Sequence, residues 1–264
     1  MQQDDWQLKL VNKSLKKKEK IDLINKHLHV NPQDILLDLG CAQGILSYFL
    51  RKKDGFWLSA DQDFINVKSS QKILKKNLLH LEPGPLPFKD KSFDKVVCLD
   101  YLEHLEDDQL CVDEIFRVLK KGGEFIAATP RTGKFFILNY LRPLLGMKLE
   151  FYGHKRQGYT LKQLKKLLEK ADLQFIRHKS FSGFITEFIE LMLNFLYIKL
   201  FSRKESFQLR DGHIRPSTSS EFKSSQKAFN LYSLLYPLIW MVTRIDKIFF
   251  FQRKYGLMVW AQKK

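Results

Sequence analysis

The stretch that decides the fold is ILLDLGCAQG, residues 35–44. An apolar run that ends in an acid and a glycine is typical of a buried parallel strand followed by a tight turn. Gly40 lets the backbone turn and approach a ligand, and Gly44 allows close packing where a helix begins. Residues 45–53, ILSYFLRKK, are expected to form that helix. The loop has no P-loop lysine, which argues against a triphosphate ligand.

The alternation of strand and helix continues to residue 130. Apolar runs predict further strands at 56–61, 77–82, 93–100 and 124–130. Helical spacing predicts helices at 66–76 and 103–119, the second of which Lys121-Gly122-Gly123 is expected to stop. Strands that alternate with helices imply right-handed crossovers and a parallel sheet, so the fold class is α/β.

The flanking segments are organised differently. Residues 1–32 are predicted to form a helical arm that Asn31-Pro32 ends. After residue 130 we expect a helix at 160–171 with Thr160 as its N-cap, and strands at 173–181 and 256–262. Between these strands lie apolar helices at 184–201 and 228–251, joined by a polar stretch at 202–227 that we expect to be mobile. The predicted organisation is an arm (1–32), a core (33–183), an insertion (184–251) and a final strand segment (252–264).

Positive charge is concentrated in the second half of the chain. Residues 1–130 hold 20 basic and 20 acidic side chains, whereas residues 131–264 hold 25 and 9, together with 15 of the 22 phenylalanines. This division favours a balanced catalytic core joined to a region that faces something anionic and apolar, such as a membrane surface. A basic solvated face around an ordinary core is the alternative.

Composition and cysteine content indicate the class of the protein and its expected location. A hydrophobic content of 44% and a charged content of 28% are those of a folded globular protein. Cys41, Cys98 and Cys111 are odd in number and are not arranged as metal-ligand pairs, so we expect a reducing compartment and no metal site. The first 20 residues lack the apolar segment of a secretory signal. The expected location is cytoplasmic, including the inner face of the membrane.

Two longer segments carry a family resemblance. LPFKDKSFDKVVCLDYLEHLEDD (86–108) and EIFRVLKKGGEFIAATP (114–130) closely resemble the signature of class I S-adenosylmethionine-dependent methyltransferases, in particular methyltransferase type 11, which includes enzymes of ubiquinone and menaquinone biosynthesis. The resemblance covers about residues 33–130. It implies S-adenosyl-L-methionine as cofactor and a Rossmann-like, seven-stranded, mostly parallel sheet. Helices would cover both faces of the sheet, with a helical insertion between the last two strands.

The resemblance also assigns cofactor contacts to the glycine loop. Asp38–Gly44 would wrap the methionine end of the cofactor, with backbone groups of Gly40 and Cys41 near its amino and carboxylate groups. The chain departs from the family at Ala42, which stands where the family has its middle glycine and adds a methyl group close to the cofactor.

Further contacts are expected at the ends of the next strands. Asp61 closes the second predicted strand, where a carboxylate can accept hydrogen bonds from ribose hydroxyls. By resemblance Gln62 would lie beside the adenine, and Glu82, one methylene longer than the usual aspartate, would meet the adenine amino group. Asp100 and Tyr101 would line the methionine side and open toward the acceptor.

Methyl transfer is a one-step displacement, so the enzyme mainly aligns the acceptor with the methyl group and its sulfonium leaving group. A base is required only if the acceptor must lose a proton, and His104, His154 and Tyr101 are the candidates. His154 lies in FYGHKRQGYT, where the family tends to place substrate contacts; an exposed loop histidine is the alternative. The Glu103-His104 pair, predicted to open a helix, is often structural in the family.

The two insertion helices are short of a membrane span. The first carries Glu187, Glu190 and Lys199, and the uncharged run of the second, 228–243, contains Pro237 and falls below the ~20 residues required. Both fit interfacial helices whose aromatic and flanking basic residues suit lipid headgroups. Packing together as a lid or a dimer surface is the alternative.

The leading functional hypothesis is therefore a methyltransferase for a lipid-like or lipid-linked acceptor at a membrane surface. A methyltransferase for a soluble small molecule or sugar, with the insertion as a lid, is the second. An RNA methyltransferase is disfavoured because no N-P-P-[FYW] motif follows the fourth predicted strand, where residues 100–103 read DYLE. A non-catalytic binding protein is the fourth. The acceptor atom (O, N or C) and the oligomeric state do not follow from the sequence.

Overall fold

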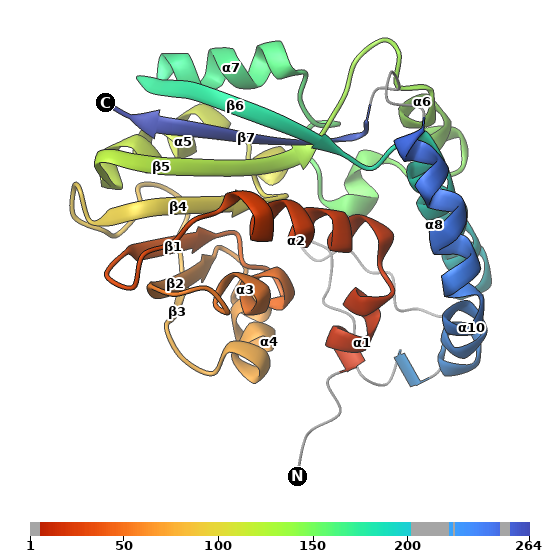
Figure 1. Cartoon of the computed structure of the whole chain (residues 1–264). Coiled ribbons are helices and arrows are strands. Elements are labelled where there is room, and N and C mark those ends of the chain that lie inside the picture. The colour runs from red at the N-terminus through yellow and green to blue at the C-terminus, as the bar shows by residue number, and fades with distance from the viewer. Residues whose placement is uncertain (1–5, 202–221, 224, 249–253) are drawn as a thin grey trace.

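The computed structural model describes residues 6–201, 222–223, 225–248 and 254–264. Within these residues the chain forms a seven-stranded sheet in the order β3-β2-β1-β4-β5-β7-β6 (Figure 1). The strands are β1 (Ile35–Leu39), β2 (Phe56–Asp61), β3 (Leu78–His80), β4 (Phe93–Leu99), β5 (Leu119–Pro130), β6 (Leu173–Phe181) and β7 (Gly256–Lys263). Only the two pairings that involve β7 are antiparallel. The predicted α/β class and mostly parallel sheet are confirmed.

Helices cover both faces of the sheet. On one face, α2 (Leu15–His27) and α3 (Ile45–Leu50) bury Ile24 and Leu50 in one apolar cluster with the sheet. On the other, α5 (Asp108–Val118) and α7 (Leu161–Lys170) bury Ile115 and Leu168 in a second cluster. α4 (Phe64–Leu74) lies beside α3 and β3. The sheet is therefore apolar on both sides, as the largely hydrophobic sequences of β1 and β4 predict.

The predicted helix at 160–171 is confirmed as α7, and the Thr160 side chain accepts from the Gln163 backbone N–H in a capping box. The predicted helix at 103–119 was wrong at its start, and the expected stop at Lys121-Gly122-Gly123 was wrong as well. Residues Leu102–His104 form only a 3₁₀ turn, η1, and α5 begins after Asp107, whose carboxylate caps Leu110 N. The helix ends at Val118 rather than at the glycines, because the chain is already extended at Leu119 and pairs with β4.

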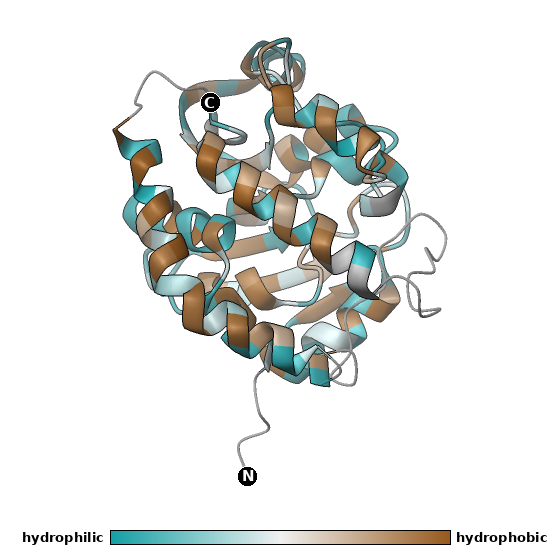
Figure 2. Cartoon of the chain, turned by 90° about the vertical axis from the view of Figure 1, so that its right-hand side faces the viewer, coloured by the Kyte–Doolittle hydropathy of each residue, from teal (hydrophilic) through white to brown (hydrophobic). Residues whose placement is uncertain are grey.

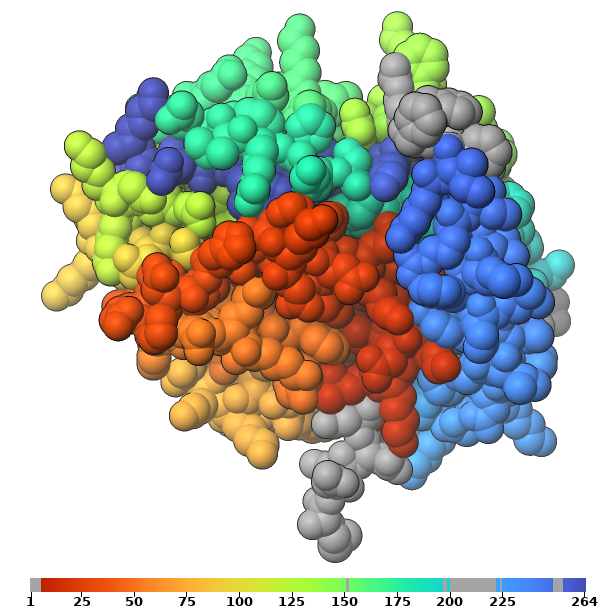
Figure 3. All heavy atoms as spheres, viewed as in Figure 1, coloured from red at the N-terminus to blue at the C-terminus, as the bar shows by residue number. Residues whose placement is uncertain are grey.

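The N-terminal arm is two helices, α1 (Trp6–Asn12) and α2, because the Ser14 side chain accepts from Lys17 N and starts a second helix. A further helix, α6 (Ile137–Leu144), and a 3₁₀ turn, η2 (Leu149–Tyr152), lie between β5 and α7. The sequence did not predict them. Figure 3 shows the arm, in red, between the orange core and the blue helix of the insertion.

The insertion contributes α8 (Phe184–Phe201), α10 (Gln226–Thr243) and a 3₁₀ turn, η3 (Arg244–Lys247). The second predicted helix was too long, since α10 ends at Thr243; residues 249–251 of that prediction, and 202–221 of the polar stretch, lie outside the described residues. α6, α8 and α10 stand at the end of the sheet where the parallel strands finish (Figure 1). They therefore close the end at which α/β proteins bind ligands.

The sheet order also locates the ligand crevice. β1 has β2 on one side and β4 on the other. After β1 the chain adds β2 and β3 on one side, and it then crosses back to add β4 on the other side. Such a switch point opens a crevice at the carboxyl ends of the two central strands. The glycine loop follows β1 and Asp100 follows β4. The two segments that the sequence singled out thus meet at this crevice.

Candidate active site

The glycine loop is held tightly by its own backbone. Gly40 has φ +80°, and a Cβ there would lie 2.4 Å from the Tyr101 ring. The N–H groups of Gly40 and Cys41 both donate to the Ala60 carbonyl, at 2.8 and 3.1 Å. These N–H groups are already used, so the loop offers carbonyl oxygens to a ligand, and carbonyls suit the amino end of methionine rather than its carboxylate.

Asp61 braces the same loop. Its carboxylate accepts from Ala42 N at 2.7 Å and from Asp63 N at 2.9 Å. Each carboxylate oxygen has a second lone pair, so the residue can still accept from ribose hydroxyls. Burial raises the pKa of Asp61 despite these two backbone hydrogen bonds. Asp61 therefore shapes the loop in addition to the ligand role that the sequence predicts.

Asp38 lies beneath the loop and is only 3% exposed. Its Oδ2 has no hydrogen-bond partner among the described residues. Burial raises the pKa of Asp38 to about 6, although Ser47, Ser59 and Arg51 lie close enough to lower it. A buried carboxylate with an unused oxygen is costly for folding, and such a group is a natural partner for a ligand's cationic or hydroxyl group.

The adenine end of the crevice is open. The carbonyl of Gln62 hydrogen bonds with His80 Nε2 at 3.0 Å, so its backbone is fixed to β3. The Glu82 side chain is 85% exposed and lies 3.6 Å from His80 Nδ1. Glu82 thus stays in solvent, and an adenine contact remains an expectation for both residues.

At the other end of the loop, α1 covers it. Gln7 is buried, and its Nε2 donates to Gln43 Oε1 at 3.0 Å. A tight backbone loop, with an unpartnered carboxylate oxygen beneath it and a polar side chain above it, fits the polar methionine end of S-adenosylmethionine. Ala42 is accommodated at φ +46°, so its methyl group costs backbone strain without closing the loop.

Asp100, at the end of β4, is a strained residue. Its φ of +53° is rare for a side chain other than glycine, and its N–H donates to Ala128 O at 2.8 Å. Its carboxylate forms an ion pair with Lys20 of the arm. Burial opposes ionisation of Asp100, but Lys20, Lys16 and His104 outweigh it and keep the pKa below its usual value. Strain of this kind persists where the fold fixes a functional group.

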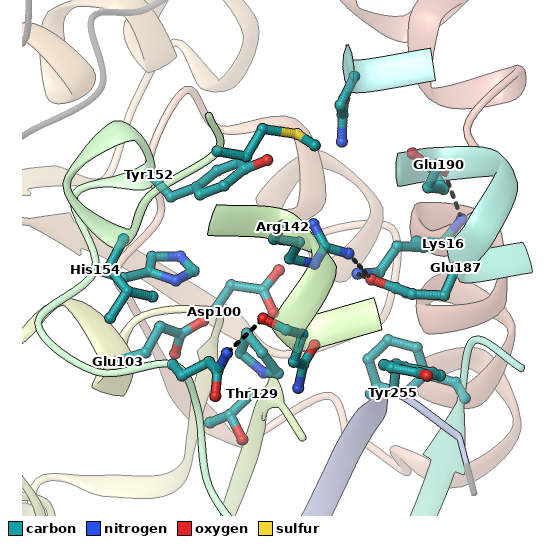
Figure 4. A pocket seen from close by; sticks show the side chains of 18 of the residues that line it. Lys16, Asp100, Glu103, Thr129, Arg142, Tyr152, His154, Glu187, Glu190 and Tyr255 are labelled. Carbon is teal, nitrogen blue, oxygen red and sulfur yellow. Dashed lines mark hydrogen bonds and ion pairs between the residues drawn. The ribbon is translucent and has the colours of Figure 1, made fainter. Parts of the chain in front are cut away.

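A cavity of about 530 Å³ opens beside Asp100 (Figure 4). Its lining comes from the arm, η1, β5, α6, η2 and α8, and it includes Lys16, Lys20, Asp100, Glu103, Thr129, Asn139, Arg142, Tyr152, His154, Glu187, Glu190 and Tyr255. No residue of the glycine loop is part of the lining. The cavity therefore adjoins the cofactor crevice at Asp100, on the side where an acceptor must approach.

One wall of the cavity holds a buried charge network. Glu187 of α8 pairs with Lys16 of the arm at 3.1 Å and with Arg142 of α6, and it accepts from Ser182 Oγ at 2.6 Å. Burial opposes ionisation of Glu187, but Lys16 and Arg142 lower its pKa overall. Three segments far apart in sequence are tied together here, so the cavity exists only when arm, α6 and insertion are all in place.

Two of the predicted catalytic residues lie together at the cavity, and one of them, His154, lines it. The rings of His104 and His154 lie 4.7 Å apart between centroids, nearly perpendicular. Burial and the neighbouring His104 lower the pKa of His154 to about 3, so its imidazole is neutral. Tyr101 lies elsewhere, packed against Gly40, and burial raises its pKa well above the usual value. Its hydroxyl is therefore a poor base at neutral pH.

Sequence reasoning missed several lining residues. Glu103 was judged structural, yet it is fully buried and faces the cavity. Burial, followed by the charge of Asp100, raises its pKa to about 8. Lys16, Lys20 and Arg142 look like ordinary solvated charges in the sequence. Only their tertiary partners reveal them, although the acids of α8 were a signal, since Glu187 and Glu190 interrupt an otherwise apolar helix.

Part of the chain is similar in sequence to known methyltransferases. Residues 37–127 match the family described as "Methyltransferase domain". A demethylmenaquinone methyltransferase from Oceanobacillus iheyensis is 24% identical over 184 residues, which cover 60% of this chain and 77% of that protein. A ubiquinone biosynthesis O-methyltransferase from Pelagibacter ubique is 31% identical over 107 residues, or 39% of this chain and 45% of that protein. An uncharacterized protein from Methanocaldococcus jannaschii, MJ0638, is 30% identical over 109 residues, 46% of its length.

Solved structures agree on the fold. A SAM-dependent methyltransferase from Methanosarcina mazei superposes with a TM-score of 0.53 at 16% identity, covering 90% of this chain and 96% of that chain. The [4+2]-cyclase SpnF superposes with a TM-score of 0.58 at 14% identity, covering 94% and 81%. Fold, glycine loop and domain match together define a class I S-adenosylmethionine-dependent methyltransferase. Within that class, residues 37–127 are similar to the methyltransferase type 11 domain, for which the cofactor is S-adenosylmethionine. The chain spans about half the length of two of these relatives.

Proposed function

We propose that the protein transfers the methyl group of S-adenosylmethionine to a lipid-like small molecule that enters the cavity beside Asp100 from a membrane surface. The cavity carries the proposal. Its volume of about 530 Å³ suits a small ring compound, and it adjoins the methionine end of the cofactor crevice. Two relatives are named for menaquinone and ubiquinone biosynthesis, whose substrates join a ring to an apolar chain.

The residues around the cavity are suited to alignment rather than to covalent chemistry. Bound S-adenosylmethionine supplies the methyl group and its leaving group. Asp100, fixed by its backbone and by Lys20, defines the floor between cofactor and acceptor. The arm and α8 close the cavity through the pair between Lys16 and Glu187, and this closure excludes water from the reacting groups.

Exposed apolar side chains support the membrane part of the proposal. Leu144 at the end of α6 is 81% exposed, and Leu234 of α10 is 76% exposed. Their helices carry further exposed apolar residues, namely Ile137, Tyr140, Leu141, Leu231, Leu235, Leu238 and Met241. Figure 2 shows apolar colour along the helices on this side of the molecule. Among the described residues, no helix is long and apolar enough to cross a membrane. Interfacial binding needs no such helix.

One observation favours a soluble acceptor instead. α8 lines the cavity with Glu187, Glu190 and Asn194, so the first half of the insertion acts as the lid that the alternative requires. In the insertion, α8 therefore forms part of the cavity wall, and α10 presents apolar side chains to the outside. A lid alone leaves the exposed leucines of α10 without a role.

Methyl transfer is tested with a hydroquinone acceptor. Two substrates that share a ring, one with a prenyl tail and one without, are incubated with the protein, and S-adenosylhomocysteine is measured. We expect faster turnover with the tailed substrate and a loss in Asp61→Ala, which removes a brace of the cofactor loop. Equal rates for both substrates would favour the soluble acceptor, and absence of cofactor binding by calorimetry would contradict the enzyme itself.

Membrane binding is tested separately by sedimentation with vesicles that contain phosphatidylserine. Leu234→Glu and Leu144→Glu are expected to weaken binding by about tenfold or more, because each places a charge in the apolar contact. Leu110→Glu is the matched control, since this residue of α5 is also exposed (43%) but lies outside α6 and α10. Equal binding by all three variants would contradict a contact through these helices.

A further inference from the structure

Three side chains that can bind metals lie together at the acceptor cavity, and two of them, Glu103 and His154, line it. Glu103 and His104 lie in η1, just after β4, and His154 follows η2. One ligand atom of each residue lies within 4.8 Å of the ligand atoms of the other two. Figure 4 shows Glu103 and His154 on the same side of the cavity, close to Asp100. No local pattern predicts this cluster, because His104 and His154 are separated along the chain by α5, β5 and α6.

The environment of Glu103 indicates a ligand-binding role. It is 0% exposed, and neither carboxylate oxygen has a hydrogen-bond partner among the described residues. Buried carboxyl groups are usually protonated, paired with another group or bound to a metal ion, because an isolated buried carboxylate is costly. Glu103 also lines the cavity, so a bound ion could reach it from the crevice. The carboxylate thus supplies an observation independent of the histidine cluster.

The histidines have the arrangement of ligands. The Gly153 carbonyl can only accept, so His104 Nδ1 donates to it, at 3.0 Å. This hydrogen bond places the ring proton on Nδ1, and a hydrogen bond from the other ring nitrogen is the usual second contact of a metal-bound histidine. The His154 ring stands nearly perpendicular to that of His104, with 4.7 Å between centroids. Two imidazoles can therefore approach one point from different directions.

We propose that Glu103, His104 and His154 bind one divalent transition-metal ion in the wall of the acceptor cavity, with coordination positions left open toward the cavity. Two imidazole nitrogens and one carboxylate match the preferences of Zn²⁺, Co²⁺ and Fe²⁺. They do not suit Mg²⁺, which prefers oxygen ligands. Three protein ligands with an open position are typical of catalytic rather than structural sites.

The role of this ion rests on the proposed function, whereas its binding does not. An acceptor hydroxyl that occupies an open position would lose its proton to water more readily, because a metal ion lowers the pKa of a bound hydroxyl. The resulting oxygen then forms the C–O bond as the C–S bond of the sulfonium breaks, and S-adenosylhomocysteine leaves. The ion is neither oxidised nor reduced. The site therefore favours an oxygen acceptor over a carbon one.

Metal binding is tested with Co²⁺ and Zn²⁺ alone. Full-length protein without a histidine tag is dialysed against a chelator and titrated with Co²⁺ by visible absorption, and Zn²⁺ affinity is measured by competition with a chromophoric chelator. We expect one equivalent, visible ligand-field bands and no thiolate charge-transfer band. Glu103→Gln and His154→Gln are each expected to raise the Kd by about tenfold or more. His80→Gln is the control, because His80 also lies near a carboxylate, that of Glu82, but outside the cavity.

Sub-stoichiometric binding, a thiolate band, or an unchanged Kd in both cavity variants would overturn the site. Thermal unfolding of each metal-free variant establishes that it is folded, and the two variants act at different elements, so failure of one leaves the other informative. These titrations contain neither cofactor nor acceptor. A stoichiometric site in a protein that methylates no hydroquinone would overturn the proposed function alone, and full methylation in excess chelator would overturn the metal's catalytic role alone.

Discussion

At Asp38 the buried carboxylate influences folding through its own ionisation. Burial raises its pKa from 3.8 to about 6. Because the folded-state pKa lies above the unfolded value, the group favours folding below pH ~4, and this contribution is lost as the pH rises through 6. At neutral pH the ionised carboxylate therefore destabilises the ligand-free protein. A carboxylate that lowers the stability of the ligand-free protein in this way is expected where a bound ligand interacts with its negative charge.

Asp38→Asn is accordingly expected to stabilise the ligand-free protein at pH 7. The upper bound is about 3 kcal/mol, from a pKa difference of roughly two units at about 1.4 kcal/mol each. The gain should shrink to nothing near pH ~3, below the ordinary pKa of 3.8, where the carboxyl group is neutral in both the folded and the unfolded state. Urea unfolding at the two pH values checks this, with the exposed Asp54→Asn as control. A gain that does not change with pH would contradict the titration argument.

Ala42 provides a second prediction at this scale. Its φ of +46° lies in the left-handed region, where a Cβ costs about 1–2 kcal/mol. Ala42→Gly is expected to raise the free energy of unfolding by about 1 kcal/mol, after the larger chain entropy of glycine is subtracted. Ala171→Gly, at φ −94°, is the matched control and should be neutral or destabilising. Destabilisation by both variants would show that no strain is stored at Ala42.

At the scale of elements, Asp246 joins the two ends of the insertion. It is 5% exposed, and its carboxylate accepts from Ile185 N at 2.9 Å and Thr186 N at 2.8 Å. These are the first N–H groups of α8, which no turn of that helix can satisfy. A residue of η3, some sixty positions along the chain, thus caps the helix that lines the cavity. The negative charge also complements the positive end of the helix.

Asp246→Ala should therefore lower the free energy of unfolding by about 0.5–2 kcal/mol, the range for a lost helix cap. Local opening should be concentrated in α8. Hydrogen exchange measured by mass spectrometry should show faster exchange in peptides from α8 and unchanged exchange in α7. The exposed Asp22→Ala in α2 is the control. Uniformly faster exchange throughout the chain would contradict a local capping role.

The elements differ in how far the sequence predicted them. β2, β6 and α8 have the bounds that their apolar runs predict, because burial on a sheet or along a helix leaves a regular pattern. The cap of α8 could not be predicted, since Asp246 reaches it through tertiary structure alone. The end of α5 was misjudged for a related reason: pairing with β4 draws Leu119 into the sheet before the glycines are reached. Local patterns identify elements, and long-range contacts decide their ends.

At the scale of the whole molecule, charge is divided between two halves with different tasks. The net charge of +16 comes from residues 131–264 alone, since the first half is balanced. The second half also supplies α6, α8 and α10. A basic region that carries exposed leucines is attracted to anionic surfaces over about one Debye length and then makes short-range apolar contact.

Binding to phosphatidylserine vesicles should consequently have two separable components. Raising the salt concentration to ~0.5 M should weaken binding about tenfold or more by screening the basic half. The residual binding should then disappear in Leu234→Glu. Sedimentation with neutral phosphatidylcholine vesicles provides the comparison, since salt should have little effect on it. Vesicle binding that is independent of salt would contradict a contribution from the charge division.

The candidate site was predictable in part, again for physical reasons. The glycine loop, Asp61 and Asp100 follow strands, so their position at the carboxyl edge follows from the fold class. The acceptor cavity could not be predicted, because Lys16, Arg142 and Glu187 come from three segments that meet only in the folded chain. In the same way, nothing local to His104 or His154 indicates that their rings meet.

The two ends of the insertion meet at a single point of the core, and this has an evolutionary consequence. The Tyr255 N–H donates to the Ser182 carbonyl at 2.8 Å, so the chain leaves β6 and re-enters β7 across one hydrogen bond. Such a junction behaves like the base of a hairpin: segments of any length can be gained or lost there without shifting the strands, since loop-closure entropy rises only slowly with length. The insertion can thus change in length over evolution without moving the strands, as long as α8 keeps its ion pairs with Lys16 and Arg142, and such changes would alter which acceptor fits the cavity.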